Sequence, residues 1–301
     1  MNKFRGTGVA LVTPFDKNGN VDFHSLENVI NHVIKGGVEY VVSLGTTGET
    51  PALTSDEKVA VVKHTIKTAN KRVPVVAGIG GNSTQEVINT IKKFDFKGVD
   101  AVLSVSPYYN KPNQRGIYEH YKAVAAACPL PIIVYNVPGR TSSNITAETT
   151  LKLAHEITNI IAVKEASGNM DQMMQIIKHK PKDFLVISGD DLITLPIIAS
   201  GGEGVISVIA NAFPHEFSEM TRQSLAGNFE NARKFHYTLD EFTRLIFADG
   251  NPSGVKCVLN MMKITLPYVR LPLVQVNPQV ENALKAEYSG YKKTEVHFEL
   301  R

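Results

Sequence analysis

Eight short apolar runs recur along the chain up to residue 207, and most are rich in β-branched residues. Their apolar residues follow one another without the alternation of a half-exposed strand, which is typical of parallel strands buried on both faces. The runs lie at residues 9–12, 40–43, 73–77, 101–105, 132–135, 160–164, 184–187 and 204–207. This pattern predicts eight buried parallel strands.

Longer segments with a helical period separate these runs. In residues 23–34 apolar side chains recur at i, i+3, i+4 and i+7, and Gly36-Gly37 follows as a stop signal. Thr54, with Glu57 three residues later, has the spacing of a capping box at the start of another helix. The alternation predicts an α/β fold, a closed (β/α)8 TIM barrel. An open doubly wound sheet would have a glycine fingerprint after its first strand, where this chain has Thr13-Pro14-Phe15.

The pattern changes after the eighth unit. From about residue 230 to residue 288 the chain has only helix-like segments, such as 232–247 and 255–262, and it is polar from Ser289 onward. No low-complexity linker separates the two parts. We expect a (β/α)8 catalytic barrel at residues 1–225 and a C-terminal helical extension with a polar tail at residues 226–301.

Composition and charge narrow the function classes. The 32 Lys and Arg residues against 29 acidic residues give a net charge of only +3 without a basic run, so we expect no nucleic-acid partner. No apolar stretch approaches the ~18 residues of a membrane span, and residues 1–6 lack the apolar core of a secretion signal. Two distant cysteines, Cys128 and Cys257, suit a reducing compartment. We expect a soluble, cytoplasmic protein with no membrane partner.

Lys164 is the sharpest candidate for chemistry. In a (β/α)8 barrel the active site is built at the carboxyl ends of the strands, and Lys164 closes the sixth apolar run. Burial at that point disfavours a charged ammonium and favours the neutral amine, which attacks carbonyl groups. The alternative is a structural lysine paired with Glu165 or another acid.

Three further segments stand at predicted strand ends. The small residues of Gly45-Thr46-Thr47-Gly48-Glu49 let the backbone approach a ligand, and consecutive N–H groups bind carboxylates, although a tight strand-to-helix turn uses the same residues. The Tyr135 hydroxyl suits a proton relay to Lys164, or simple packing with a solvated tip. Arg140 suits a substrate carboxylate held by two hydrogen bonds, or is an ordinary surface arginine.

Taken together, these segments resemble the dihydrodipicolinate synthase family, in the superfamily of aldolases that hold pyruvate on a lysine. The motifs that carry the resemblance are Gly45-Thr46-Thr47-Gly48-Glu49, Pro107-Tyr108-Tyr109-Asn110, Tyr135-Asn136-Val137-Pro138-Gly139-Arg140-Thr141, Val163-Lys164-Glu165-Ala166-Ser167-Gly168, Ser188-Gly189-Asp190-Asp191, Gly204-Val205-Ile206-Ser207-Val208 with Asn211, and Arg270-Leu271-Pro272-Leu273. They stand in order on the predicted strands, from about Gly6 to Tyr288.

The resemblance implies a lyase of diaminopimelate and lysine biosynthesis with four catalytic residues. Lys164 forms an imine (Schiff base) with pyruvate, the resulting enamine attacks L-aspartate 4-semialdehyde, and ring closure releases the lysine. Tyr135, Thr46 and Tyr109 relay protons, with Tyr109 reaching into the neighbouring subunit's site. Each proton transfer needs a hydroxyl within hydrogen-bond reach. No metal and no organic cofactor is expected.

The resemblance also implies four substrate-binding residues. Thr47, mainly through its backbone, holds the pyruvate carboxylate, and Arg140 guides the carboxylate of the semialdehyde. Gly189 and Ile206 line the pocket. Because Tyr109 acts across an interface, we expect a homo-oligomer, and the family suggests a tetramer built as a dimer of dimers.

A regulatory site is also suggested by the resemblance. Asn82, Glu86 and Tyr108 match positions at which some family members bind inhibitory lysine at a subunit interface. A carboxylate such as Glu86 suits an ammonium partner. The alternative is that these residues only pack at the interface.

Other enzyme classes make different demands on the same positions. Sister enzymes that cleave sialic acid or deoxy sugar acids share the lysine, but usually carry small residues where this chain has Arg140. A pyridoxal-phosphate enzyme would bind phosphate after strands seven and eight, where Gly189-Asp190-Asp191 places carboxylates. A non-catalytic protein on the same fold would not need every matched catalytic position. The segment Asn251-Pro252-Ser253-Gly254-Val255-Lys256 lacks the family's common isoleucine–proline pair, and its place in the extension predicts little influence on the chemistry.

Overall fold

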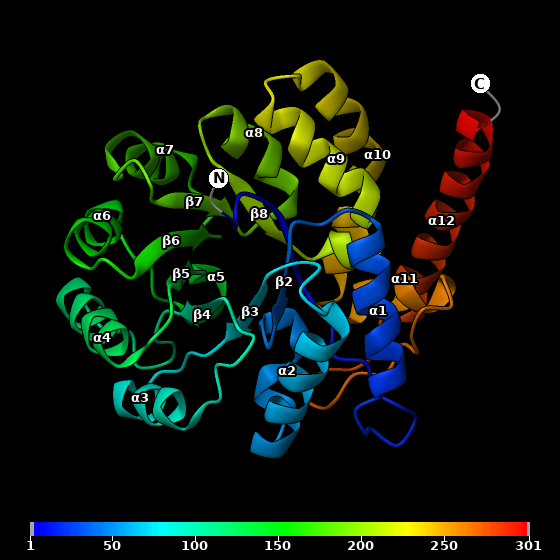
Figure 1. Ribbon diagram of the computed structural model, residues 1–301. Helices are drawn as coiled ribbons and strands as arrows, with labels where there is room; N and C mark the ends of the chain where they lie inside the picture. Colours follow the sequence, from blue (N-terminus) through cyan, green and yellow to red (C-terminus); the bar gives the residue numbers. More distant parts are fainter. Residues whose placement is uncertain (1–2, 300–301) are drawn as a thin grey trace.

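Eight parallel strands form a closed barrel in the order of the chain, as Figure 1 shows for the computed structural model. The structure describes residues 3–299, with side chains up to Tyr291. Pairing of β1 with β8 closes the ring. The strands are β1 (Gly6–Ala10), β2 (Tyr40–Ser43), β3 (Val75–Gly78), β4 (Ala101–Val105), β5 (Ile132–Asn136), β6 (Ile160–Glu165), β7 (Leu185–Ser188) and β8 (Gly204–Ser207). The predicted fold class is confirmed, and each predicted run overlaps a strand.

The first strand differs most from its predicted position. β1 begins at Gly6, whereas the apolar pattern placed its start at Val9. The pattern missed the first residues of the strand because two of them are glycines. A Cβ atom on Gly8 would lie 2.2 Å from the Tyr40 ring, so this position must lack a side chain for the ring to fill the barrel interior. Beyond the end of the strand, the Val12 N–H donates to the Asn211 side chain at 3.1 Å.

Helices cover the outside of the barrel between successive strands (Figure 1). The predicted stop at Gly36 and the capping box of Thr54 and Glu57 are both confirmed. The helices are α1 (Phe23–Lys35), α2 (Ser55–Ala69), α3 (Thr84–Lys93), α4 (Gln114–Ala127), α5 (Pro138–Thr141), α6 (Ala147–Glu156), α7 (Met170–His179), α8 (Thr194–Ala199) and α9 (Pro214–Leu225). Short 3-10 turns follow three of the strands: η1 (Thr46–Gly48) and η2 (Thr50–Ala52), η3 (Asp191–Ile193), and η4 (Ile209–Asn211).

Three helices form the C-terminal extension: α10 (Phe229–Ala248), α11 (Ser253–Met261) and α12 (Pro278–Glu299). Its side chains share one buried cluster with the barrel, since Phe242 and Val258 lie in the same cluster as Phe15. The predicted division at residue 225 falls between α9 and α10, and it stays a prediction. The polar segment from Ser289 is the last part of α12 rather than a separate tail, and positions 300 and 301 lie outside the described residues.

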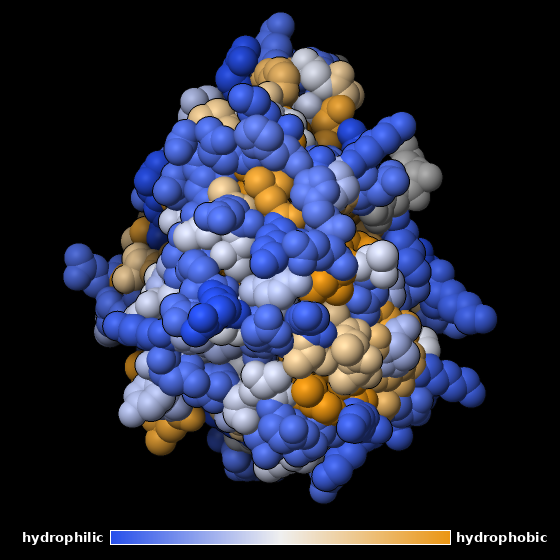
Figure 2. Space-filling model, turned by 90° about the vertical axis from the view of Figure 1, so that its left-hand side faces the viewer, coloured by the Kyte–Doolittle hydropathy of each residue, from blue (hydrophilic) through white to orange (hydrophobic). Residues whose placement is uncertain are grey.

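The outer surface follows from the amphipathic helices. Val87 and Ile91, one turn apart on α3, are buried, whereas the following Lys92 and Lys93 are exposed. Figure 2 shows the face on which α4 and α6 lie as largely hydrophilic, with small hydrophobic areas between polar ones. Within residues 3–299, no helix is both long and apolar enough to cross a bilayer.

Candidate active site

Lys164 lies near the carboxyl end of β6 and is only 4% exposed. Its register partner on β5 is Tyr135, and its Nζ lies 4.2 Å from the centre of the Tyr135 ring. Among the described side chains, those of residues 3–291, Nζ takes part in no ion pair. The structure therefore brings Lys164 and Tyr135 together as the sequence predicted.

Glu165 does not neutralise Lys164. Successive side chains of a strand point to opposite faces, and the Glu165 carboxylate faces outward from the barrel into a buried polar network. It accepts hydrogen bonds from Asn136 Nδ2 (3.0 Å), the Ser167 N–H (2.7 Å) and Gln172 Nε2 (2.9 Å). The alternative of a structural Lys164–Glu165 pair is therefore wrong.

Gly189 provides the space that the lysine side chain occupies. A Cβ atom on Gly189 would lie 3.0 Å from Lys164 Cε and 2.8 Å from the Ala166 side chain. The Gly189 N–H donates to the Glu165 carbonyl at 2.8 Å, which continues the pairing of β7 with β6. Ile206, on β8, is buried in the same interior cluster as Tyr135. Gly189 thus directly follows β7 beside Lys164, and Ile206 lies inside the barrel on β8.

The threonine turn follows β2 at the carboxyl end of the barrel. Thr46 and Thr47 begin the 3-10 turn η1, in which the Gly48 and Glu49 N–H groups donate to the carbonyls of Gly45 and Thr46. The first N–H groups of such a turn have no internal partner and are available to an anion. The Thr13 hydroxyl donates to the Gly48 carbonyl at 2.8 Å, and this bond joins the turn to the segment after β1.

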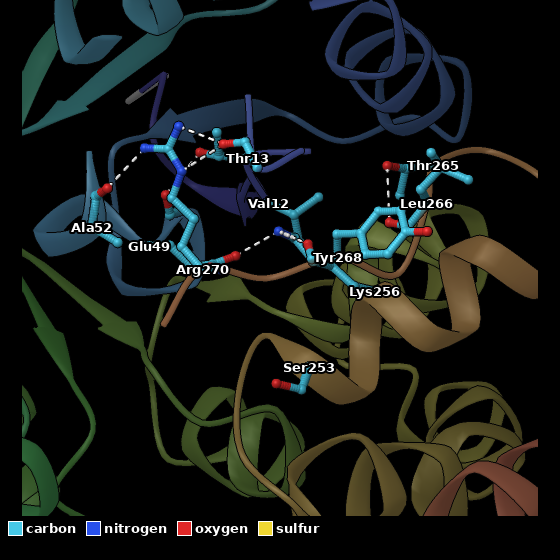
Figure 3. Close-up of polar contacts among 12 residues, drawn as sticks. Val12, Thr13, Glu49, Ala52, Ser253, Lys256, Thr265, Leu266, Tyr268 and Arg270 are labelled. Carbon is cyan, nitrogen blue, oxygen red and sulfur yellow. Dashed lines mark hydrogen bonds and ion pairs between the residues drawn. The ribbon is translucent and has the colours of Figure 1, made fainter. Parts of the chain in front are cut away.

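Two side chains of the C-terminal extension hold this turn. Asn251 Nδ2 donates to the Thr47 hydroxyl oxygen at 3.1 Å, and Lys256 forms a fully buried ion pair with Glu49. Figure 3 shows Lys256 and Arg270 beside Glu49, with the Arg270 guanidinium directed toward Ala52. The segment that departs from the family's common pattern therefore contacts the threonine turn, and the expectation that this departure has little influence on the chemistry stays a prediction. The sequence did carry a signal for these contacts. An asparagine and a lysine, which are rarely buried, stand in an otherwise apolar segment at the start of a helix.

Both carboxylate oxygens of Glu49 accept hydrogen bonds. Its second oxygen accepts the Arg270 N–H at 2.9 Å, while Lys256 Nζ also donates to the Tyr268 carbonyl at 2.8 Å. Both cations stack on Phe15, with Lys256 Nζ 4.3 Å from the ring centre. Burial lowers the pKa of Lys256 to about 8, and the Glu49 carboxylate opposes that shift. Glu49 itself has a φ of 53°, which only a firmly held non-glycine residue adopts.

Asp191 occupies the place where many barrels bind phosphate. One oxygen of its buried carboxylate accepts the N–H groups of Val208 and Ile209, both at 2.9 Å. Burial raises the pKa of Asp191 to about 6 despite these bonds. Because an internal carboxylate already uses the N–H groups after β8, this site does not suit the phosphate of a pyridoxal cofactor. Within the described residues, no cluster of three or more His, Cys, Asp or Glu side chains is arranged to hold a metal ion.

Other predicted residues lie at the rim. Arg140 is exposed on the one-turn helix α5, directly after β5, rather than on an open loop. Tyr109, in the segment after β4, is 88% exposed, so in a single chain its ring is not part of the pocket. Thr46 also lies at the mouth, without a hydrogen bond to Tyr135 among the described residues. The direct contact in the predicted relay is that between Lys164 and Tyr135.

The predicted regulatory residues lie together on the neighbouring rim. Asn82 and Glu86 stand at the start of α3, and Tyr108 follows β4. The Asn110 side chain donates to the Asn82 carbonyl at 3.0 Å and joins the two segments. Glu86 also lies in the first turn of α3, where an acid stabilises the helix.

Similarity to known proteins decides the family. The sequence model of the dihydrodipicolinate synthetase family matches residues 3–289, which is nearly the whole chain. The chain belongs to this family. A 4-hydroxy-tetrahydrodipicolinate synthase from Parabacteroides distasonis is 53% identical over 270 residues, covering 90% of this chain and 91% of the relative.

Solved structures of the family have the same fold. A chloride-inhibited dihydrodipicolinate synthase from Acinetobacter baumannii, complexed with pyruvate, superposes with a TM-score of 0.93 at 38% identity, over 96% of this chain and 99% of the other. A dihydrodipicolinate synthase from Cyanidioschyzon merolae with lysine bound has a TM-score of 0.93 at 38% identity, over 97% and 99% of the two chains. The resemblance inferred from the motifs is therefore confirmed.

Proposed function

We propose that this chain is a 4-hydroxy-tetrahydrodipicolinate synthase, a lyase that condenses pyruvate with L-aspartate 4-semialdehyde in diaminopimelate and lysine biosynthesis. The observation that carries the proposal is Lys164, a buried amine against Tyr135 without a carboxylate partner among the side chains of residues 3–291. The identity to relatives of that name supports the choice among lysine-dependent aldolases.

The reaction begins with covalent capture. The neutral Lys164 amine attacks the keto carbon of pyruvate, and loss of water leaves an imine. The imine withdraws electrons, so that a methyl proton leaves and an enamine forms. Its methylene carbon attacks the aldehyde of the semialdehyde, and the semialdehyde amine then attacks the imine carbon and displaces Lys164 as the ring closes.

Hydroxyl groups move the protons in this scheme. We assign Tyr135 to this task, because its ring lies against the Lys164 amine. We assign Thr46 and Tyr109 to the same relay, with Tyr109 supplied by a neighbouring subunit. Its 88% exposure in one chain fits a side chain that an interface covers. This assignment requires at least a homodimer, and a tetramer of two such dimers is proposed.

The two substrate carboxylates need separate partners. We assign the pyruvate carboxylate to the N–H groups at the start of η1, chiefly that of Thr47, and the semialdehyde carboxylate to the exposed guanidinium of Arg140. Gly189 and Ile206 shape the space between them. A guanidinium at the rim favours an acidic aldehyde over a neutral sugar.

Reductive trapping tests the covalent step. With pyruvate and borohydride, one reduced pyruvate should attach to the peptide that contains Lys164, as seen by mass. Lys256 is the internal control, because it is equally buried but paired with Glu49 and should stay unmodified. Lys164→Arg should abolish trapping and lower kcat by at least about 1000-fold. Full activity of Lys164→Arg, or label on another residue, would refute the proposal.

Substrate assays separate the sister enzymes. If the chain is the synthase, we expect product from pyruvate with L-aspartate 4-semialdehyde and no cleavage of sialic acid or deoxy sugar acids. Arg140→Ala should raise KM for the semialdehyde by roughly 10- to 100-fold, because it removes a charge-assisted contact. An unchanged KM for the semialdehyde would contradict the role of Arg140.

Regulation and location complete the proposal. Inhibition by lysine at Asn82, Glu86 and Tyr108 is supported by their common position at the rim, and Glu86→Ala should weaken it.

A cytoplasmic location is supported by two buried free cysteines, since burial raises the pKa of Cys128 and that of Cys257, the latter to about 11. Such thiols are poorly reactive and do not act as redox groups.

A further inference from the structure

A side chain from outside the barrel controls the Thr47 hydroxyl. Asn251 stands between α10 and α11, separated from Thr47 by 204 positions, and its Nδ2 donates to Thr47 Oγ1. Both residues are buried. Because the Thr47 oxygen accepts this bond, its own hydrogen must point elsewhere. That hydrogen is therefore directed away from Asn251.

The position of Asn251 is itself fixed by the extension. The Ser253 hydroxyl donates to the Val274 carbonyl at 2.6 Å, and Lys256 joins the next turn of α11 to Glu49. Glu49 is the C-terminal capping residue of η1, the turn that contains Thr47. The turn is thus held at two points, at the Thr47 hydroxyl and at the Glu49 carboxylate, by residues of one short segment.

We propose that Asn251 is a positioning residue for pyruvate: by donating to Thr47 Oγ1 it directs the Thr47 hydroxyl hydrogen toward the pyruvate carboxylate. This inference rests on the proposed function, in which the turn at residues 46–49 binds that carboxylate. Lys256 supports the same arrangement by anchoring Glu49. The C-terminal extension thereby completes a substrate site that is otherwise built from barrel residues.

Two substitutions, one that keeps the shape of the side chain and one that removes it, distinguish orientation from packing. Asn251→Asp keeps the shape of the side chain, but a carboxylate accepts the Thr47 hydrogen and turns it away from the pocket, while its charge repels a second carboxylate. Asn251→Ala removes the side chain and leaves the Thr47 hydroxyl free to rotate. We expect half-saturation for pyruvate to rise on the order of 100-fold in Asn251→Asp, and only about 3- to 10-fold in Asn251→Ala.

The measurement is borohydride trapping of pyruvate on Lys164 as a function of pyruvate concentration, together with KM for each substrate. KM for the semialdehyde should stay within about twofold in both variants. In a Thr47→Val background, Asn251→Ala should have no further effect on pyruvate half-saturation, because the two residues act through one hydrogen bond. Thermal unfolding monitors whether each variant folds.

A matched control is Asn159→Asp, at the opposite end of the barrel. Asn159 donates to the Ala125 carbonyl at 2.9 Å, and its loss should lower thermal stability without changing pyruvate half-saturation. Equal half-saturation in Asn251→Asp and the wild type, or a larger effect of Asn251→Ala than of Asn251→Asp, overturns this inference alone. Absence of trapping in the wild-type protein overturns the proposed function, and this inference with it.

Discussion

Two buried lysines of this chain have opposite surroundings. Lys256 has a carboxylate, a carbonyl and an aromatic face as partners, whereas Lys164 Nζ lies against the Tyr135 ring and forms no ion pair among residues 3–291. The Glu49 carboxylate and the Tyr268 carbonyl hold the Lys256 amine in place, so it is not free to approach a keto carbon. At the scale of the residue, we propose that this difference decides which lysine reacts with a keto acid.

Gly189→Ala is expected to impair imine formation. The added methyl group would press on Lys164 Cε, at 3.0 Å, and on the Ala166 side chain, so the lysine must shift. Overpacking of this kind costs about 1–3 kcal/mol, which corresponds to a fall in kcat/KM of roughly 5- to 150-fold. Steady-state kinetics and the rate of borohydride trapping measure the effect.

Gly290→Ala on α12 is the control for this substitution, because open space surrounds that position. It should leave kinetics unchanged and keep or slightly raise stability, since alanine favours helix. If Gly189→Ala retained wild-type kcat/KM, the close approach to Lys164 would have no part in the chemistry.

Asp191→Asn is expected to remove a pH dependence of stability. Burial raises the pKa of Asp191 from 3.8 to about 6 in the folded protein. The folded state therefore binds the proton more tightly, and this contribution to stability is complete below about pH 4 and lost as the pH rises through about 6. An asparagine keeps an oxygen for the Val208 and Ile209 N–H groups but does not titrate.

Urea unfolding at several pH values measures how the stability contribution of Asp191 depends on pH. The difference in unfolding free energy between Asp191→Asn and the wild type should move in favour of the variant by up to about 3 kcal/mol from about pH 4 to about pH 7. A difference that stayed constant over this range would show that Asp191 does not titrate there.

At the scale of elements, the η1 turn depends on a helix that follows it by some two hundred residues. Lys256→Met leaves the Glu49 carboxylate buried with only the Arg270 N–H as partner. Breaking a buried pair at one side costs about 3–5 kcal/mol, whereas replacing both charges costs less. We therefore expect the double variant Glu49→Gln, Lys256→Met to be more stable than Lys256→Met alone.

Chemical denaturation of the two single variants and the double variant gives the coupling energy between these residues. Arg270 should tolerate the double change, because a glutamine oxygen still accepts its N–H. If the double variant were less stable than either single variant, Glu49 and Lys256 would contribute independently rather than as a pair.

At the scale of the whole molecule, one buried cluster of side chains spans the predicted division at residue 225. Leu239, Phe242 and Ile246 of α10 are buried with Phe15 and Phe213. Exposing only these three side chains of α10 would cost about 5–9 kcal/mol, which is comparable with the ~5–15 kcal/mol net stability of a protein. The barrel segment and the extension therefore depend on each other.

A chain ended after Leu225 is expected to lose cooperative folding. Circular dichroism during heating should show no sharp transition, and a hydrophobic dye should bind where α10 and α11 packed. The full chain is the reference under the same conditions. A sharp transition in the shortened chain would show instead that residues 1–225 are an independent domain.

Much of the fold was predictable because its signals are local. Continuous apolar runs, the stop at Gly36 and the capping box at Thr54 depend on residues a few positions apart. β1 was misplaced because its Gly6 and Gly8 are required by the distant Tyr40 ring, and a window along the sequence does not include that contact.

The sequence by itself determined the eight strand–helix units, the place of a lysine at the end of the sixth strand and the family to which the motifs belong. Only the tertiary structure decided that Glu165 faces away from Lys164, that Asp191 occupies the N–H groups after β8, and that Asn251 and Lys256 hold the Thr47 turn. The physical reason is range. Periodicity and caps arise from neighbours along the chain, whereas the partner of a buried polar group is selected by packing between segments that the sequence separates widely.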